Sequence, residues 1–437
     1  TYSCAQPLVA GDGNTADDPA FVSRAANDYH LATGSFAADT ATNLPDVLVD
    51  IEGAVRPTDG NGDLVDRSDM GCYEKAAAGA AFECSFSGAP TAGTNSLTVV
   101  FTAAVSGPGT NVVTYYWDWE NDGLVDYAGP DASVVTNLYA EPGLYSVRLV
   151  CTNALGDTAS QTKISYVQVF SAVACVDTNG GNVWPYHTWA KAAMDLGNAV
   201  AAVTPGGTVY VTDGVHTVSF PISLDKAVII RSIHGAASTT IRSTGPEVFL
   251  VNTNAVLIDG FLFRDAVLTY YHYGIVTMNG GGTLVNSIIT GNNIGSGGGV
   301  QAGSNALVAN CVITNNIASH QNTGYGGGVR ILPGGTVSNC YIAFNSANDG
   351  GGGVYMTGGL LANCTVLRNT RAGGNNNYGG GIYIAGGLVR NCVVQSNTAS
   401  GATTLGGGGV YMTGGGLRSV LVADNTTTNK GGGVYMT

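Results

Sequence analysis

The feature that most constrains this chain is a repeat in its C-terminal part. An asparagine, followed in most copies by a cysteine, recurs at intervals of 24 to 29 residues, and a second asparagine stands six residues after it. A Gly-Gly-Gly-Val or Gly-Gly-Gly-Ile block keeps the same step, and a Gly-Gly pair precedes most copies. A repeat of this length indicates a solenoid or another array of small structural units. The first asparagine position is occupied by Asn286, Asn310, Asn339, Asn363 and Asn391, and by Ser419 in the last copy.

Each copy contains short apolar segments, such as residues 311–313 and 354–356, separated by turns rich in glycine and asparagine. Turn corners with positive φ suit these two residue types. One copy cannot bury its own apolar face, but stacked copies can, with paired strands about 4.8 Å apart. We therefore expect a solenoid of stacked coils over residues 206–437.

Stacking in register predicts two side-chain ladders. The second asparagine of each copy should form an amide ladder, and the cysteine should form an inward ladder of small buried side chains without redox or metal chemistry. The amide ladder comprises Asn316, Asn345, Asn369, Asn397 and Asn425. The thiol ladder comprises Cys311, Cys340, Cys364 and Cys392.

Two further segments precede the repeat. Short alternating strands separated by turns predict a β-sandwich over residues 83–170, in which Cys84 and Cys151 fall on strands and could pair. The expected strands are residues 97–102, 113–119, 133–139, 143–153 and 161–169. An amphipathic run after Thr188, which is a plausible N-cap, predicts a helix that covers the first coil and stops before Pro205.

The sandwich resembles a known family. Trp-Asp-Trp-Glu-Asn-Asp-Gly at residues 117–123 resembles the Trp-Asp-Phe-Gly-Asp-Gly signature of polycystic kidney disease (PKD) domains, and residues 139–153 look like that family's second signature. The resemblance implies an immunoglobulin-like spacer or contact module of an extracellular protein, without catalytic activity. The repeats resemble those of bacterial surface and secreted proteins with pectate-lyase-like right-handed β-helices. The expected fold class is all-β: a right-handed parallel β-helix solenoid plus an immunoglobulin-like (PKD) β-sandwich.

The order of the segments suggests a tandem arrangement. Residues 1–78 look like the C-terminal closing segment of a preceding β-helix, and residues 79–171 form the PKD-like sandwich. A linker and capping helix would occupy residues 172–205, and a β-helix truncated mid-coil would occupy residues 206–437. Because an uncapped coil templates further stacking, we expect one period of a tandem array or filament, with copies of the chain itself as partners.

Charge and hydropathy exclude some partners. The formal net charge of -13 at pH 7 repels nucleic-acid phosphates, so nucleic acid is not an expected partner. No apolar stretch approaches the length of a membrane span. An extracellular or cell-surface location fits both the composition and the family resemblance.

The regular coils from residue 297 onward lack the residues that catalysis needs. A polysaccharide lyase or hydrolase requires paired carboxylates, or Asp ligands for Ca²⁺ beside a basic residue, and carboxylates are nearly absent from residue 297 onward. We therefore expect no catalytic residues and a non-enzymatic structural or adhesive protein. The alternative is a secreted β-helix that binds or cleaves carbohydrate, with surface glycans as partners. Its sugar-stacking candidates are Tyr270, Tyr271, Tyr273, Tyr355 and Tyr411, which fit a ladder or core role better.

Two acidic loops are candidate Ca²⁺ sites because oxygen-bearing side chains recur at alternate positions. The first contains Asp59, Asn61, Asp63 and Asp69 and resembles a dockerin-like loop, although Leu64 stands where glycine is usual. The second contains Asp118, Glu120, Asp122 and Asp126. For both loops the alternative is a cluster of Asx turns without a metal.

Overall fold

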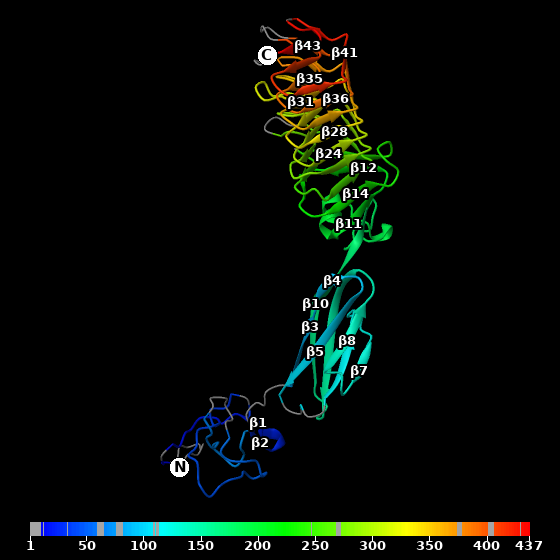
Figure 1. Cartoon of the computed structure of the whole chain (residues 1–437). Coiled ribbons are helices and arrows are strands. Elements are labelled where there is room, and N and C mark those ends of the chain that lie inside the picture. Colours follow the sequence, from blue (N-terminus) through cyan, green and yellow to red (C-terminus); the bar gives the residue numbers. More distant parts are fainter. Residues whose placement is uncertain are drawn as a thin grey trace. The chain divides into compact units, whose positions relative to one another are not determined.

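The computed structural model confirms the all-β fold class (Figure 1). The chain forms two compact units, of which the larger contains the whole solenoid. No helix in the described part of the chain is long and apolar enough to span a bilayer. The described residues are 10–11, 13–32, 34–58, 65–75, 82–107, 110, 113–245, 247–267, 272–373, 378–400, 406–428 and 430–437.

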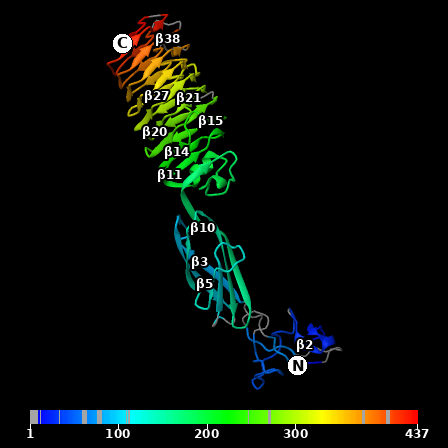
Figure 2. The same ribbon diagram turned by 90° about the vertical axis from the view of Figure 1, so that its right-hand side faces the viewer.

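The solenoid consists of coils stacked from β11 to β43, green to red in Figure 1, and Figure 2 shows the same stack from the side. Each coil adds one strand to each of three parallel sheets, and later coils add a short fourth strand. The first sheet contains β11 (Val203–Val211), β14 (Val228–Ser232), β17 (Val256–Asp259), β20 (Gly282–Val285), β24 (Ala306–Ala309), β28 (Thr336–Ser338), β32 (Leu360–Ala362), β36 (Leu388–Arg390) and β40 (Gly416–Arg418). The second contains β12 (Gly214–Val218), β15 (Thr239–Ser243), β18 (Leu262–Arg264), β21 (Ile288–Thr290), β25 (Val312–Thr314), β29 (Tyr341–Ala343), β33 (Thr365–Leu367), β37 (Val393–Gln395) and β41 (Leu421–Ala423).

The third sheet contains β13 (Ile222–Leu224), β16 (Phe249–Val251), β19 (Val276–Met278), β23 (Val300–Ala302), β27 (Val329–Ile331), β31 (Val354–Met356), β35 (Ile382–Ile384), β39 (Val410–Met412) and β43 (Val434–Met436). The short strands are β22 (Asn293–Ile294), β26 (Ile317–Ala318), β30 (Ser346–Ala347), β34 (Thr370–Arg371), β38 (Thr398–Ala399) and β42 (Thr426–Thr427). The register places like residues above one another, so Ile313, Ile342 and Val366 stack in a buried apolar core.

The first asparagine of each repeat occupies a corner with left-handed backbone. Asn363, for example, has φ of 55°, a conformation that asparagine and glycine adopt at less cost than other residues. Its equivalents Asn286, Asn310, Asn339, Asn391 and Ser419 share this conformation. Asparagine therefore recurs at this position because it adopts the left-handed backbone conformation at little cost.

The second asparagine forms the predicted ladder along the solenoid axis. The Asn345 Nδ2 donates to Asn369 Oδ1 at 3.0 Å, and the Asn369 Nδ2 donates to Asn397 Oδ1 at 3.0 Å. The same Asn369 Nδ2 also donates to the Ile342 carbonyl of the preceding coil at 2.9 Å. The ladder extends one coil further than predicted, because Asn292 donates to Asn316 Oδ1 at 2.8 Å.

The Gly-Gly-Gly block packs directly against this ladder. A methyl group added at Gly353 would lie 2.8 Å from Asn369 Nδ2, and one added at Gly352 would lie 2.4 Å from the Gly380 carbonyl oxygen. Such distances leave no room for a Cβ atom, so these positions require glycine for steric reasons. The Gly-Gly-Gly block and the second asparagine of each repeat therefore pack against each other, and each limits which residue the other position can hold.

The four repeat cysteines form the predicted buried ladder with free thiols. Cys364, for example, donates its thiol to the Ala362 carbonyl at 3.1 Å and accepts the Cys340 N–H at 3.4 Å. Cys84 and Cys151 are free as well, with their thiols in hydrogen-bond contact, and this contact raises the pKa of Cys151. The disulfide considered for this pair is therefore not formed in this structure.

Two sheets form the sandwich, and the predicted strands are confirmed. One sheet contains β3 (Glu83–Ala89), β5 (Leu97–Ser106) and β8 (Val134–Tyr139), and the other contains β10 (Thr158–Val176), β9 (Gly143–Asn153), β6 (Val113–Asp118) and β7 (Tyr127–Gly129), with β4 (Ala92–Thr94) beside β10. Trp117 is buried between Phe86 and Trp119, whose ring centroids lie 5.3 and 5.0 Å from it. Its indole N–H donates to the Ala132 carbonyl at 2.9 Å.

The predicted start of the capping helix was wrong. Thr188 precedes only a short 3₁₀ turn, η2 (Trp189–Lys191), and its side chain caps nothing, whereas α1 (Leu196–Ala202) begins after Asp195. The reason is that Ala193 is extended and exchanges backbone hydrogen bonds with the end of β10. The Asp195 side chain then accepts the Asn198 N–H at 3.0 Å and starts the helix.

The N-terminal segment contains β1 (Phe21–Ser23), η1 (Arg24–Ala26) and β2 (Asp28–Leu31), and the two strands pair antiparallel. Among its described residues there is no parallel coil. Its assignment as the closing segment of a preceding β-helix stays a prediction.

Candidate metal centre

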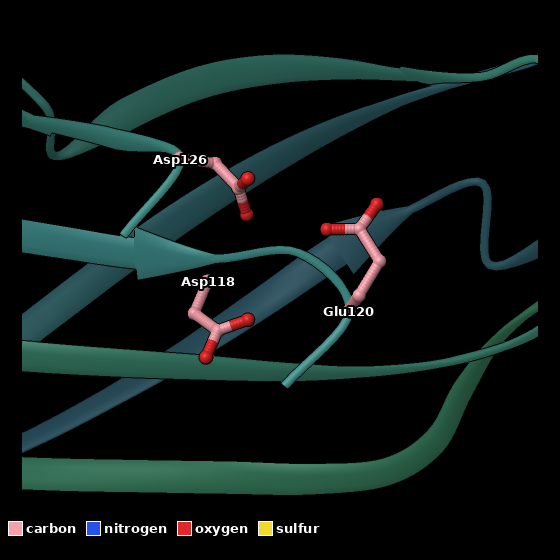
Figure 3. A group of neighbouring side chains, drawn as sticks. All are labelled: Asp118, Glu120 and Asp126. Atoms are coloured by element: carbon pink, nitrogen blue, oxygen red, sulfur yellow. The ribbon is translucent and has the colours of Figure 1, made fainter. Parts of the chain in front are cut away.

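Three of the four predicted carboxylates of the sandwich lie together at one end of the β6–β7 hairpin (Figure 3). Asp118 is the last residue of β6, Glu120 follows in the turn, and Asp126 immediately precedes β7. The antiparallel pairing of Trp117 with Tyr127 returns Asp126 to the level of Asp118. As a result, one carboxylate oxygen from each of the three lies within 4.8 Å of the others.

Backbone hydrogen bonds orient two members of this group. Asp118 is buried and accepts the Asp122 N–H at 3.1 Å and the Gly123 N–H at 2.9 Å, while Asp126 Oδ2 accepts the Trp119 N–H at 2.6 Å. These bonds are those of an Asx-rich turn, as the metal-free alternative expects. Asp122 accepts the Leu124 N–H at 2.8 Å and does not belong to the group.

The negative charges of the three carboxylates lie so close together that binding a proton or a cation is favoured. Burial raises the pKa of Glu120, and the negative charge and hydrogen bond of Asp126 and the charges of Asp122 and Asp118 raise it further. Either a proton or a cation relieves such crowding of carboxylates. The donors are all oxygen, the ligand type that hard divalent cations such as Ca²⁺ prefer, so Asp118, Glu120 and Asp126 could hold one with water completing the coordination.

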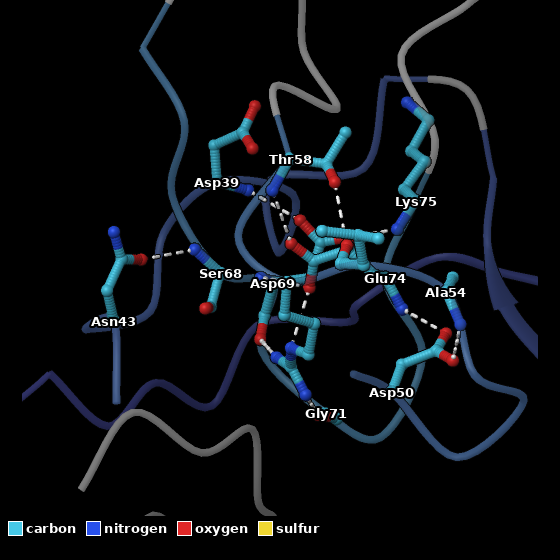
Figure 4. Close-up of polar contacts among 12 residues, drawn as sticks. Asp39, Asn43, Asp50, Ala54, Thr58, Ser68, Asp69, Gly71, Glu74 and Lys75 are labelled. Atoms are coloured by element: carbon cyan, nitrogen blue, oxygen red, sulfur yellow. Dashed lines mark hydrogen bonds and ion pairs between the residues drawn. The ribbon is translucent and has the colours of Figure 1, made fainter. Parts of the chain in front are cut away.

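The first acidic loop gives a different picture. Asp59, Asn61 and Asp63 lie outside the described residues. Asp69 is described and buried, and its two carboxylate oxygens accept the backbone N–H groups of Asp39 and Lys75 (Figure 4). The structure thus places Asp69 in a buried hydrogen-bond network.

That network surrounds an ion pair that the sequence did not reveal. Arg56 Nε lies 2.8 Å from Glu74 Oε2, and Arg56 also donates to the backbone carbonyls of Asp69 and Gly71. Glu74 accepts the N–H groups of Thr58 and Asp69. Burial raises the pKa of both Glu74 and Asp69. The arrangement holds an irregular segment together, and no periodicity in one sequence relates Arg56 to Glu74.

The solenoid offers little acid–base chemistry. Asp349 and Asp424 are the only carboxylate side chains from residue 297 to 437. Asp349 is fully buried, and Asp424 accepts the Gln395 amide at 2.9 Å. In the earlier coils Asp259 pairs with Arg231 at 3.0 Å and accepts the Asn286 amide, so it stabilises a corner. Among the described residues, the only group of three potential metal ligands is in the sandwich.

The solenoid tyrosines stack on one another along the third sheet. Tyr355 lies 4.9 Å from Tyr383, which lies 5.7 Å from Tyr411. Burial raises the pKa of Tyr355 to about 12, and Tyr411 is only 3% exposed because Tyr378 packs against it. Tyr411 therefore has no open face for a sugar, and Tyr270 and Tyr271 lie outside the described residues.

Comparisons with known proteins agree with this architecture. The model of the PKD domain matches residues 83–166, and the model of the right handed beta helix region matches residues 273–437. No curated protein sequence matches the chain. ORF18 of Geobacillus virus E2 is a solved structure with 15% identity and a TM-score of 0.30, covering 55% of this chain and 56% of its own, and a score this low supports no inference. The chain therefore contains a PKD domain followed by a right-handed parallel β-helix.

Proposed function

We propose that this protein is a non-enzymatic extracellular structural or adhesive protein, with the β-helix as a scaffold and the PKD domain as a spacer or contact module. Both domains are typical of extracellular proteins. The observation that carries the proposal is the scarcity of carboxylates from residue 297 onward, in coils whose repeated side chains serve stacking.

The β-helix fold occurs in enzymes and in non-enzymes, so catalytic activity depends on which residues the coils present. Glycosidic-bond cleavage uses two carboxyl groups about 5 to 9.5 Å apart. Asp349 and Asp424 lie three coils apart, or about 14 Å along the axis at about 4.8 Å per coil, and Asp349 is buried. This pair does not meet the geometric requirement.

We further propose that coils associate end to end, within a tandem array or between copies of the chain. The edge strands β41 and β43 each pair with a single neighbouring strand. Leu421 and Met436 on these strands are exposed apolar side chains that a following coil would cover. Such an edge accepts another parallel coil, whether the same chain or a second copy supplies it.

Two measurements test the proposal together. Incubation with acidic and neutral polysaccharides should release neither reducing ends nor unsaturated products. Electron microscopy at increasing protein concentration should show end-to-end assemblies. Sustained product release would overturn the non-enzymatic assignment, and single particles at every concentration would overturn the association of separate copies.

We also propose that Asp118, Glu120 and Asp126 bind Ca²⁺ and so stiffen the β6–β7 hairpin. The support is an all-oxygen group within 4.8 Å that contains a carboxyl of raised pKa. Millimolar Ca²⁺ should raise the melting temperature of the wild type and leave that of Glu120→Gln nearly unchanged. Glu83→Gln, on the distant end of β3, is the matched control, and equal shifts in all three proteins would refute the site.

A further inference from the structure

A cleft of about 740 Å³ lies beside the first coil, between α1 and the corner that joins β12 to β13. It lies outside the metal group and outside the tyrosine ladder. Val200 of the helix and Val218 of β12 are buried and form part of its floor, and Ile222 and Pro221 extend this apolar surface. The cleft is large enough for a small organic ligand or for two or three sugar rings.

The corner presents an aromatic ring at the edge of the cleft. Phe220 is 81% exposed, the largest exposed fraction among the large apolar side chains of the described residues. Leaving so much aromatic surface in water is unfavourable, and burying it against a ligand recovers that free energy. The ring has no packing role in the core, which separates it from Phe249 and Phe261.

The polar groups at the cleft include two exposed carboxylates beside one side-chain amide and three hydroxyl groups. Asp195 uses Oδ1 to accept the Asn198 N–H, and Asp225 uses Oδ1 to accept the Asn252 amide at 2.7 Å. Each of these exposed carboxylates keeps a second oxygen without a bond to another described residue. The cleft's one cation, Lys226, donates to the Ala201 and Val203 carbonyls at the end of α1, and burial lowers its pKa.

We propose that this cleft binds a neutral polysaccharide. The apolar face of a sugar ring would stack on Phe220, and its hydroxyl groups would donate to Asp195 and Asp225. The two carboxylates would repel uronate and sulfate groups. Lys226 does not offset this repulsion, because it is hydrogen-bonded to carbonyls at the end of α1. This inference rests on the adhesive part of the proposed function and gives its ligand class.

The shape of the cleft favours a sugar over an extended peptide. β12 and β13 are edge strands, which could add a peptide strand by backbone pairing. However, the corner at 219–221 interrupts this edge, β13 has only three residues, and Pro221 has no N–H to donate. A compact ring with hydroxyl groups fits a bent edge better than an extended backbone does.

The test is affinity electrophoresis of the full chain in native gels that contain β-glucan, galactomannan, dextran or polygalacturonate. At least one neutral polymer should retard the wild type, and polygalacturonate should not. Phe220→Ala should lower the affinity at least tenfold, and Asp225→Asn should lower it several-fold. Phe344→Ala removes another exposed aromatic ring from a distant coil corner and should bind like the wild type.

Three outcomes would overturn the inference: no retardation by any neutral polymer, equal retardation of Phe220→Ala, or stronger retardation by polygalacturonate. Because Phe220 is largely solvent-exposed, its truncation should leave the circular dichroism spectrum and melting temperature unchanged, which verifies folding. Failure here would leave the scaffold proposal intact, since that proposal depends on product release and end-to-end assembly.

Discussion

Replacing Asn369 by alanine tests whether the amide ladder stabilises the solenoid. The side chain is fully buried and makes four hydrogen bonds. Its Nδ2 donates to the Ile342 carbonyl and to Asn397 Oδ1, and its Oδ1 accepts the backbone N–H and the Nδ2 of Asn345. All four bonds are lost in Asn369→Ala, and the buried Asn345 N–H loses its acceptor.

The expected cost follows from that count. At about 1 kcal/mol for each hydrogen bond, Asn369→Ala should destabilise the coil stack by at least about 4 kcal/mol, and the unsatisfied Asn345 N–H adds about 1 to 3 kcal/mol. Denaturant unfolding followed by circular dichroism should show a lower midpoint. Hydrogen exchange should accelerate first in the coils on both sides of residue 369.

The matched control is Asn363→Gly in the same coil. Asn363 is exposed and has left-handed φ, which glycine also adopts, so this variant should stay within about 1 kcal/mol of the wild type. A loss below about 1 kcal/mol in Asn369→Ala, or equal losses in the two variants, would refute the structural role of the ladder.

Three further predictions concern other parts of the chain. Gly352→Ala should prevent correct stacking because its methyl group would lie 2.4 Å from the Gly380 carbonyl oxygen, whereas Gly373→Ala, with its nearest atom at 3.8 Å, should fold normally by circular dichroism. The raised pKa of Glu120 means that folding favours its protonated form, so without Ca²⁺ the melting temperature of the sandwich should fall as the pH rises above 4.5, and Glu120→Gln should weaken this dependence. A pH profile of Glu120→Gln identical to that of the wild type would contradict this assignment. Arg56→Met should destabilise the N-terminal segment by about 3 kcal/mol because it leaves the buried Glu74 without its cation, and limited proteolysis should then cut that segment faster. Unchanged proteolysis would show that the ion pair contributes little.

The sequence alone was sufficient for the solenoid because its determinants are local and repeated. Asparagine suits a left-handed corner, and glycine is needed where a Cβ would meet the backbone of the next coil. Each requirement recurs once per coil, so the pattern can be recognised by comparing the repeats within this one sequence. This explains why both ladders could be predicted residue by residue.

The remainder depends on contacts that are distant in the sequence. The start of α1 was mispredicted because Ala193 pairs with the end of β10, which no helical periodicity encodes. The spacing of Asp118 and Glu120 suggested a metal loop, but only the hairpin geometry separates Asp126, which joins the group, from Asp122, which does not. Phe220 could not be identified as a site residue from the sequence, because the cleft beside it forms only where α1, which lies earlier in the chain, meets the corner between β12 and β13.

The amide ladder also gives the solenoid a direction. Every described ladder Nδ2 from Asn292 to Asn397 donates towards the C-terminal neighbour, and every corresponding Oδ1 accepts from the N-terminal side. The amide-to-amide hydrogen bonds of the ladder therefore all run in the same direction along the axis. For the end-to-end association proposed above, two C-terminal coil faces would bring ladder donors against donors, so the ladder would favour head-to-tail contacts over a symmetric dimer.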